Sequence, residues 1–164
     1  MDGTHCPCWE PQHPTLPFDS KFYSNKHKGA GLTYEIGLAI HENRVFWVAG
    51  PYPAGHNDKL MFVKSGLQAR TVSLGKRLIA DSGYAGMDGI CLPMSKYDSP
   101  AVNMYKRRAR ARHETFNARL KNFGILKQQF RYRIDRMEKH KMVFEAICVI
   151  AQIQMDNGSP LLEV

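Results

Sequence analysis

The chain has 164 residues, of which 43% are hydrophobic and 23% are charged. This length suits a single domain, and the hydrophobic fraction excludes a wholly disordered chain. No apolar run approaches the ~20 residues of a membrane-spanning helix. The four cysteines have no regular spacing and do not predict a disulfide framework. We therefore expect one folded domain from a reducing compartment, with no membrane partner.

The positive charge is concentrated in one segment. Lys and Arg total 23 against 15 Asp and Glu, which gives a formal net charge of +8. Residues 101–141 hold 13 of the Lys and Arg and only three of the acidic residues, so the rest of the chain is slightly acidic. This segment predicts a polyanionic partner, with nucleic acid as the first candidate. A solvated helix face is an equally simple explanation.

The first third of the chain predicts strands. Four prolines within residues 1–30 are expected to interrupt regular structure there. Residues 32–40 and 45–49 are rich in β-branched and aromatic side chains, which predicts an antiparallel hairpin. Residues 50–55 contain two prolines and two glycines and predict a loop. Asn57 or Asp58 is then expected to cap a short helix that ends near Lys64.

The remainder predicts one short strand and two long helices. Residues 77–80 read as a buried strand that ends at Asp81, and residues 85–100 as irregular. A helix is predicted over 101–123, with an apolar stripe at Phe116, Leu120 and Phe123 and Gly124 as its C-cap. A last helix over 135–155 is apolar nearly all round, so we expect it to be buried.

Three acidic residues have settings that favour a functional role. Asp2 lies in Asp-Gly-Thr-His, Asp81 ends a strand, and Glu114 lies among Arg and Ala residues of the long helix. Carboxylates are the ligands that hard cations such as Mg²⁺ require, and three of them could hold two ions about 4 Å apart. The alternative for Glu114 is an ordinary ion pair within its helix. The neighbouring His113 could face the site, but an exposed helical residue is the simpler expectation.

Five segments, in this order, resemble the catalytic domain of PIF/Harbinger-type transposases, a group of DDE superfamily endonucleases. The segments are DGTHCPCWEP, FYSNKHKG, GPYPAGHNDKLMF, IADSGYAG and RARHETFNARLKNFGIL. The resemblance runs from residue 2 to about residue 155. It implies a catalytic domain over residues 1–157, with residues 158–164 as a tail. The implied fold is RNase H-like, a mixed sheet flanked by helices in the α/β class.

The resemblance also assigns chemistry to particular residues. Asp2, Asp81 and Glu114 match the Asp-Asp-Glu triad, which implies two Mg²⁺ or Mn²⁺ ions and the hydrolysis and transfer of DNA phosphodiester bonds. Asp58 matches a Gly/His/Asp element that lines the site. Lys26 and Lys28 match a basic element ahead of the second strand.

DNA is the implied partner, together with a separate DNA-binding accessory protein, and the nucleus is the implied location. Basic residues around the triad are the natural phosphate contacts, which position DNA without reading its sequence. These residues are Lys28, Arg107, Arg108, Arg110, Arg112, Arg119 and Lys121.

One departure from the family pattern concerns the start of the chain. The family has several residues of its first strand ahead of the first Asp, whereas Met1 alone precedes Asp2. We therefore expect an N-terminally truncated domain with most of its first strand missing and Asp2 on a frayed end. Two alternatives stay open. One is a decayed or domesticated derivative that binds DNA or protein without cleaving. The other is a basic RNA-binding or structural module.

Overall fold

The computed structural model describes residues 1–9, 19–92, 96–131 and 137–164. Its strands are β1 (Asp2–Pro7), β2 (Tyr23–Ser24), β3 (Gly29–Leu38), β4 (Val45–Pro53), β5 (Leu78–Ile79) and β6 (Ile90–Cys91). Its helices are α1 (Asp58–Lys64), α2 (Leu67–Ser73), α3 (Pro100–Lys121), α4 (Gly124–Lys127) and α5 (Met137–Asp156), with 3-10 turns η1 (Ser20–Phe22) and η2 (Ser82–Tyr84). The predicted α/β class is confirmed. None of the described helices is long and apolar enough to cross a lipid bilayer.

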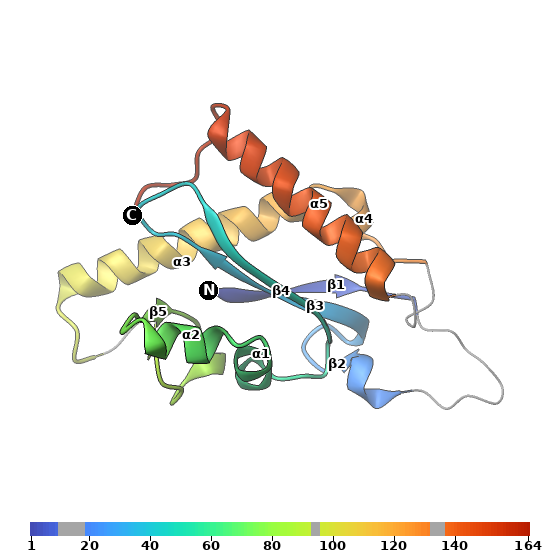
Figure 1. Ribbon diagram of the computed structural model, residues 1–164, viewed down its shortest axis with the longest axis horizontal. Helices are drawn as coiled ribbons and strands as arrows, with labels where there is room; N and C mark the ends of the chain where they lie inside the picture. The colour runs from blue at the N-terminus through green and yellow to red at the C-terminus, as the bar shows by residue number, and fades with distance from the viewer. Residues whose placement is uncertain (10–18, 93–95, 132–136) are drawn as a thin grey trace.

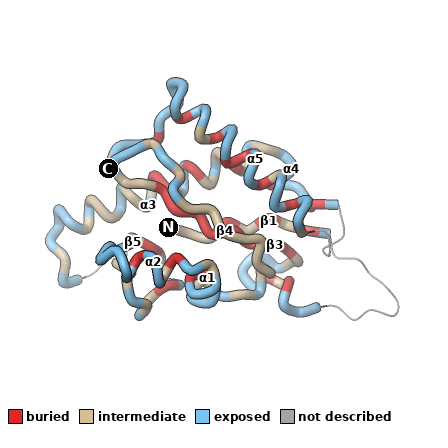
Figure 2. Tube along the Cα trace, in the orientation of Figure 1, coloured by how far each residue is buried: buried red, intermediate tan, exposed pale blue. Residues whose placement is uncertain are grey.

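Strand β3 is the centre of the main sheet. β1 pairs antiparallel along one edge, from Asp2 opposite Ile36 to Pro7 opposite Gly31. β4 pairs antiparallel along the other edge, and β2 forms a hairpin with the start of β3. Because helices cover both faces of β3, residues 31–38 are all buried (Figure 2).

The structure corrects the expectation that Asp2 lies on a frayed end. All six residues of β1 pair with β3, and Thr4 and Cys6 are buried. The Met1 amino group also donates to the Ile79 carbonyl at 2.7 Å. Pro7 fits because the N–H of the next residue donates to β3, so the nitrogen of Pro7 faces away from the ladder. Its missing N–H therefore costs no bond with β3. The other three early prolines, at positions 11, 14 and 17, lie outside the described residues.

The predicted hairpin is present with shifted boundaries. β3 begins at Gly29 and ends at Leu38, and β4 continues through residues 50–53, which sequence reasoning predicted as a loop. Prolines occur in β4 because it is an edge strand of the described sheet, where a missing N–H can face away from the ladder. α1 confirms the predicted short helix, and the Asn57 side chain caps it by accepting from Leu60 N.

The predicted mixed sheet is divided in the structure. The four strands of the main sheet pair antiparallel, while β5 and β6 form a separate parallel pair. Sequence reasoning missed β6 and α2. Both are short, and their buried residues Leu67, Thr71 and Ile90 pack against other elements, so they depend on tertiary contacts rather than on a long sequence pattern.

The long helices differ from prediction at two points. Asn122, not Gly124, is the C-cap of α3, and Gly124 begins α4. α5 is buried on one face only, because Val149 and Ile153 are 59% and 54% exposed. The start expected for this helix, residue 135, lies outside the described residues. The apolar stripe of α3 is confirmed, since Phe116 and Leu120 are fully buried.

Two hydrophobic cores flank the sheet. In Figure 1, α3 and α5 lie on one side of the main sheet, and α1 and α2 lie on the other. The larger core packs the sheet against α3, α4 and α5, with Phe116, Leu120 and Phe144 at its centre. The smaller core joins α1, α2, η2 and β6 and includes Phe62 and Tyr84, which meet edge to face.

Candidate active site

Asp2 is fixed at the boundary between the two cores by bonds to its own strand and to α3. Its Oδ1 accepts from Gly3 N at 2.8 Å, and its Oδ2 accepts from Asn117 Nδ2 at 3.3 Å. The Thr4 hydroxyl donates to Asn117 Oδ1 at 2.6 Å, so Asn117 ties α3 to β1 through two residues of that strand, Asp2 and Thr4. Asn117 is not among the site residues predicted from the sequence.

Asp81 and Asp58 come from elements of the smaller core. Asp81 follows β5 and caps η2, where its Oδ1 accepts from Gly83 N at 2.8 Å. Asp58 is the first residue of α1. Both carboxylates lie against Gly83, because a Cβ added there would overlap Asp58 Oδ2 and lie 2.9 Å from Asp81 Oδ1. A Cβ on Gly3 would lie 3.5 Å from Asp58 Oδ1, so Asp58 also approaches the strand that carries Asp2.

These three aspartates repel one another electrostatically. Burial raises the pKa of Asp2 above its ordinary value, and the nearby Asp81 raises it further. Burial also raises the pKa of Asp58, with additional contributions from Asp81 and Asp2. Lys26 lowers the pKa of both Asp2 and Asp58 and offsets part of this effect. The three aspartates therefore carry more negative charge than Lys26 alone balances.

Glu114 and His113 enter the site from α3. The exposed Glu114 accepts from Arg110 Nε at 2.9 Å, which is the intrahelical ion pair that the sequence offered as an alternative role. His113 is buried, which contradicts the expectation of an exposed residue. Its Nε2–H donates to the Ile36 carbonyl at 3.0 Å, and burial lowers its pKa to about 3, so it is neutral at pH 7.

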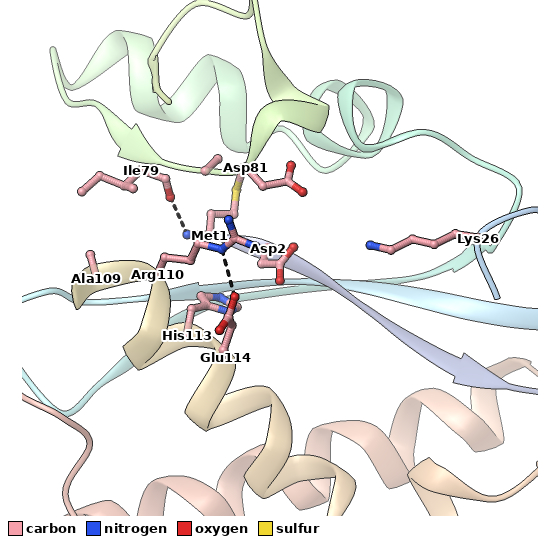
Figure 3. Close-up of a pocket in the computed structure, with 10 residues that line it drawn as sticks. Met1, Asp2, Lys26, Ile79, Asp81, Ala109, Arg110, His113 and Glu114 are labelled. Carbon is pink, nitrogen blue, oxygen red and sulfur yellow. Dashed lines mark hydrogen bonds and ion pairs between the residues drawn. The ribbon is translucent and has the colours of Figure 1, made fainter. Parts of the chain in front are cut away.

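The predicted triad lines a single hollow of about 220 Å³. Figure 3 shows Asp2 and Asp81 on one side, Glu114 on α3, and the side chains of Arg110 and Lys26 reaching in from opposite directions. A second hollow of about 480 Å³ shares Asp2, Lys26 and Asp81 with the first and includes Asp58. The structure thus brings together the carboxylates predicted from sequence, in two adjoining hollows.

The predicted phosphate contacts separate into different groups. Arg112 is buried and donates to the carbonyls of Leu162 and Glu42, so its prediction as a DNA contact is wrong. Lys121 donates to the His5 and Leu126 carbonyls and links α3 to β1, which also removes it from this set.

The other predicted contacts stay nearer the surface. Arg108 donates to the Glu163 carbonyl and Arg119 to the Ser159 carbonyl, so both hold the end of the chain against α3. Lys28 and Arg107 are exposed. Lys26, which the sequence marked only through the family pattern, faces the site more directly than Lys28 because it lines both hollows.

The donor set fits a hard divalent cation in its chemistry. The carboxylates offer only oxygen ligands, and a bound cation would offset both the burial and the mutual repulsion that raise the pKa of Asp2 and Asp58. Among the described residues, however, no three His, Cys, Asp or Glu side chains lie close enough together to hold a metal ion without movement. Three of the carboxylates would therefore have to move closer together to share one ion.

Comparison with known proteins identifies the family. A family profile described as DDE superfamily endonuclease matches residues 1–152. Searches of curated proteins and of solved structures gave no match. The matched range contains Asp2, Asp58, Asp81 and Glu114 and most of the chain. The chain therefore belongs to the DDE superfamily endonuclease family.

Proposed function

We propose that this protein is a divalent-metal-dependent DNA endonuclease of the transposase type, with Asp2, Asp81 and Glu114 as its metal-binding triad. One observation carries the proposal: these carboxylates come from β1, the end of β5 and α3, yet line one hollow with Lys26 and Arg110. Carboxylates bind the cations and basic side chains bind the phosphates of a polyanionic substrate. The family supports the same chemistry.

In this proposal the protein's own contribution is positional. Asn117 and Gly3 N hold Asp2, and Gly83 N holds Asp81. When bound, two Mg²⁺ or Mn²⁺ ions would supply Lewis acidity that activates the attacking oxygen and stabilises the leaving oxygen.

Arg110 would exchange its carboxylate partner for a DNA phosphate, which frees Glu114 for the metal site. That exchange is inexpensive, because the side chains of the pair are 60% and 59% exposed and exposed ion pairs contribute little. Lys26 would hold a second phosphate. Asp58 would support the triad from the adjoining hollow.

The finer assignments follow the sequence resemblance. We propose a Harbinger-type transposase that acts in the nucleus, alone or with a DNA-binding accessory protein. Lys28 and Arg107 are the exposed residues that would extend the DNA contact beyond the site.

A second candidate function is binding without cleavage, as in a decayed or domesticated derivative. The Arg110–Glu114 ion pair favours it, because the third carboxylate already has a partner. The lack of a ready three-ligand cluster among the described residues favours it too. The same ion pair also fits a basic RNA-binding or structural module, in which Glu114 serves only to pair with Arg110.

Nicking of supercoiled plasmid DNA in the presence of Mn²⁺ tests the proposal. The wild-type protein should convert supercoiled DNA to open circles, and the conversion should stop with EDTA. The double variant Asp81→Ala, Glu114→Ala should lose at least about a thousandfold in rate, because it removes two of the three carboxylates.

Glu145→Ala is the matched control, since Glu145 is an exposed acidic residue paired with Lys141 on α5. It should nick DNA at the wild-type rate. If the wild-type protein folds and binds DNA yet nicks no faster than the double variant, the endonuclease proposal fails. Binding without cleavage then becomes the function of this chain. Preference for RNA over DNA in the same binding assay would favour the RNA-binding module.

A further inference from the structure

The second hollow beside the carboxylates has a size and position that suit one nucleotide. It encloses about 480 Å³ and is continuous with the triad through Asp2, Lys26 and Asp81. Small-molecule sites usually measure roughly 300–1,000 Å³. A DNA strand with a phosphate at the triad would therefore have its next nucleotide at this hollow.

A stacked pair of imidazoles forms one wall of the hollow. The rings of His5 and His27 lie 4.1 Å apart with an angle of 9° between their planes. Gly31 makes the arrangement possible, because any Cβ at that position would overlap the ring of His5. His27 is an exposed residue that lines the hollow, and only one face of its ring is taken up by the stack with His5, so we take the other face as the one available to a further flat group.

The charge of the lining favours a base over a phosphate. Burial lowers the pKa of His5 to about 4 and also lowers that of His27, so both rings are neutral at pH 7. Ser20, Asn25 and Asn57 add neutral hydrogen-bonding groups. Among the described lining residues, Lys26 alone is a lysine or arginine, and it lies where the two hollows meet. A phosphate would therefore sit at Lys26 and the base beyond it.

From this geometry we propose that the second hollow is a pocket for an unpaired DNA base next to the phosphodiester bond at the triad, with His27 as its stacking platform. The inference rests on the proposed nuclease function for its choice of DNA as ligand. Stacking on an aromatic face tolerates any base, so the pocket reads whether a nucleotide is unpaired rather than which base it carries. A base within a duplex would first have to be extruded at a cost.

Fluorescence anisotropy with two DNA probes tests the pocket without requiring cleavage. One probe is a fully paired duplex, and the other has the same length and number of phosphates but ends in three unpaired nucleotides. Both are titrated in Ca²⁺ at pH 7.5. The wild-type protein should bind the frayed probe about tenfold more tightly, the size expected for one base stack.

Three variants then locate the preference. His27→Ala should reduce the ratio of the two affinities to about one, with the loss falling mainly on the frayed probe. His27→Phe should keep the preference, because stacking needs a flat ring and not its nitrogens. His41→Ala is the matched control: His41 contacts Tyr105 and does not line the hollow, so its removal should keep the full ratio.

Equal binding of the two probes by the wild-type protein would overturn the pocket. So would an equal loss for both probes in His27→Ala, because that result marks a general contact. A failure of the nuclease proposal can be distinguished from a failure of the pocket. A protein that prefers the frayed probe but does not nick plasmid DNA retains the pocket and loses the enzyme assignment. A protein that nicks DNA and binds both probes equally retains the enzyme assignment and loses the pocket.

Discussion

The larger core packs three helices against the main sheet, whereas the smaller core joins short elements on the opposite face. Asp2 and Glu114 come from β1 and α3, which belong to the larger core, while Asp58 and Asp81 come from α1 and the turn after β5. The candidate site therefore lies where the two cores meet. The difference teaches that changes in the larger core should act mainly on stability, and changes in the smaller core mainly on the relative positions of the carboxylates.

The largest expected effect comes from cutting into the larger core. Phe116 is fully buried, so Phe116→Ala should lower the free energy of unfolding by about 3–5 kcal/mol, measured by urea denaturation. Phe46 is 44% exposed on β4, and Phe46→Ala is the matched control that should cost less than about 1 kcal/mol. Equal losses in the two variants would show that stability is not concentrated in the larger core.

The second prediction concerns two buried histidines on the side of the larger core. Burial lowers the pKa of His113 to about 3 and that of His140 to about 4, against 6.5 for an unperturbed histidine. The unfolded chain binds these protons near pH 6.5 and the folded chain does not, so stability is lost as the pH falls from 6.5 toward 4. Each residue should cost roughly 2 kcal/mol at pH 5, measured by urea denaturation at pH 7.5 and pH 5.

A non-titrating variant isolates the histidine contribution. His140 Nδ1 shares a 2.8 Å hydrogen bond with the Tyr34 hydroxyl, and the amide oxygen of His140→Asn can accept that bond without taking a proton. The variant should therefore lose about 2 kcal/mol less stability on acidification than the wild-type protein. An unchanged loss would mean that His140 does not contribute to the acid sensitivity.

The third prediction separates position from stability at the smaller core. Gly83→Ala places a Cβ against Asp58 Oδ2 and Asp81 Oδ1, so both carboxylates must move. We expect a loss of about 2 kcal/mol in unfolding free energy and a fall of at least about tenfold in Mn²⁺-dependent nicking. Gly124→Ala is the control, because the nearest atom to an added Cβ is 3.8 Å away. A fully active Gly83→Ala protein would contradict the assigned role of this glycine.

The smallest expected effect is a gain. Asp58→Asn removes one of three mutually repelling charges, so in EDTA at pH 7 it should raise the unfolding free energy by about 1 kcal/mol after solvent screening. The sign follows from the raised pKa of Asp58. The ionised carboxylate destabilises the fold above that pKa, and this cost disappears when the carboxyl is protonated. Thermal unfolding of the wild-type and variant proteins, in EDTA and again in Mn²⁺, tests this. The gain in stability should disappear in Mn²⁺, because the ion stabilises the wild-type carboxylates. A less stable variant in EDTA would show that the Asp58 carboxylate stabilises the metal-free fold.

The sequence predicted elements with a strong local pattern and missed those defined by packing. The apolar period of α3 and the cap of α1 were sufficient to predict these two helices. The family resemblance named the four carboxylates that line the two hollows. Prolines were misleading in β1 and β4, because composition does not reveal that a strand lies at the edge of a sheet. Because residues 135–155 are apolar nearly all round, the sequence also predicted full burial of α5, although only one of its faces is buried.

The roles of basic residues depended on tertiary contacts that sequence does not reveal. Arg112 and Arg110 are two positions apart on one helix, yet Arg112 is buried against backbone carbonyls and Arg110 reaches into the hollow. The burial of His113 and the tie through Asn117 arise from the packing of α3 on β1 and β3, which sequence spacing alone cannot predict. The charge count therefore indicated the helix that contributes Arg110 to the hollow, but not which of its basic residues line that hollow.

The tie between Asp2 and Asn117 has a consequence for protein synthesis. These residues are 115 positions apart in the chain, so the ribosome makes the first carboxylate of the site long before the helix that holds it. Domains assemble as units once their parts have been translated. A nascent chain that has not yet completed and packed α3 has neither Glu114 nor the amide of Asn117 in place. If this protein cuts DNA, its cutting site therefore cannot form before α3 has been made and packed against β1.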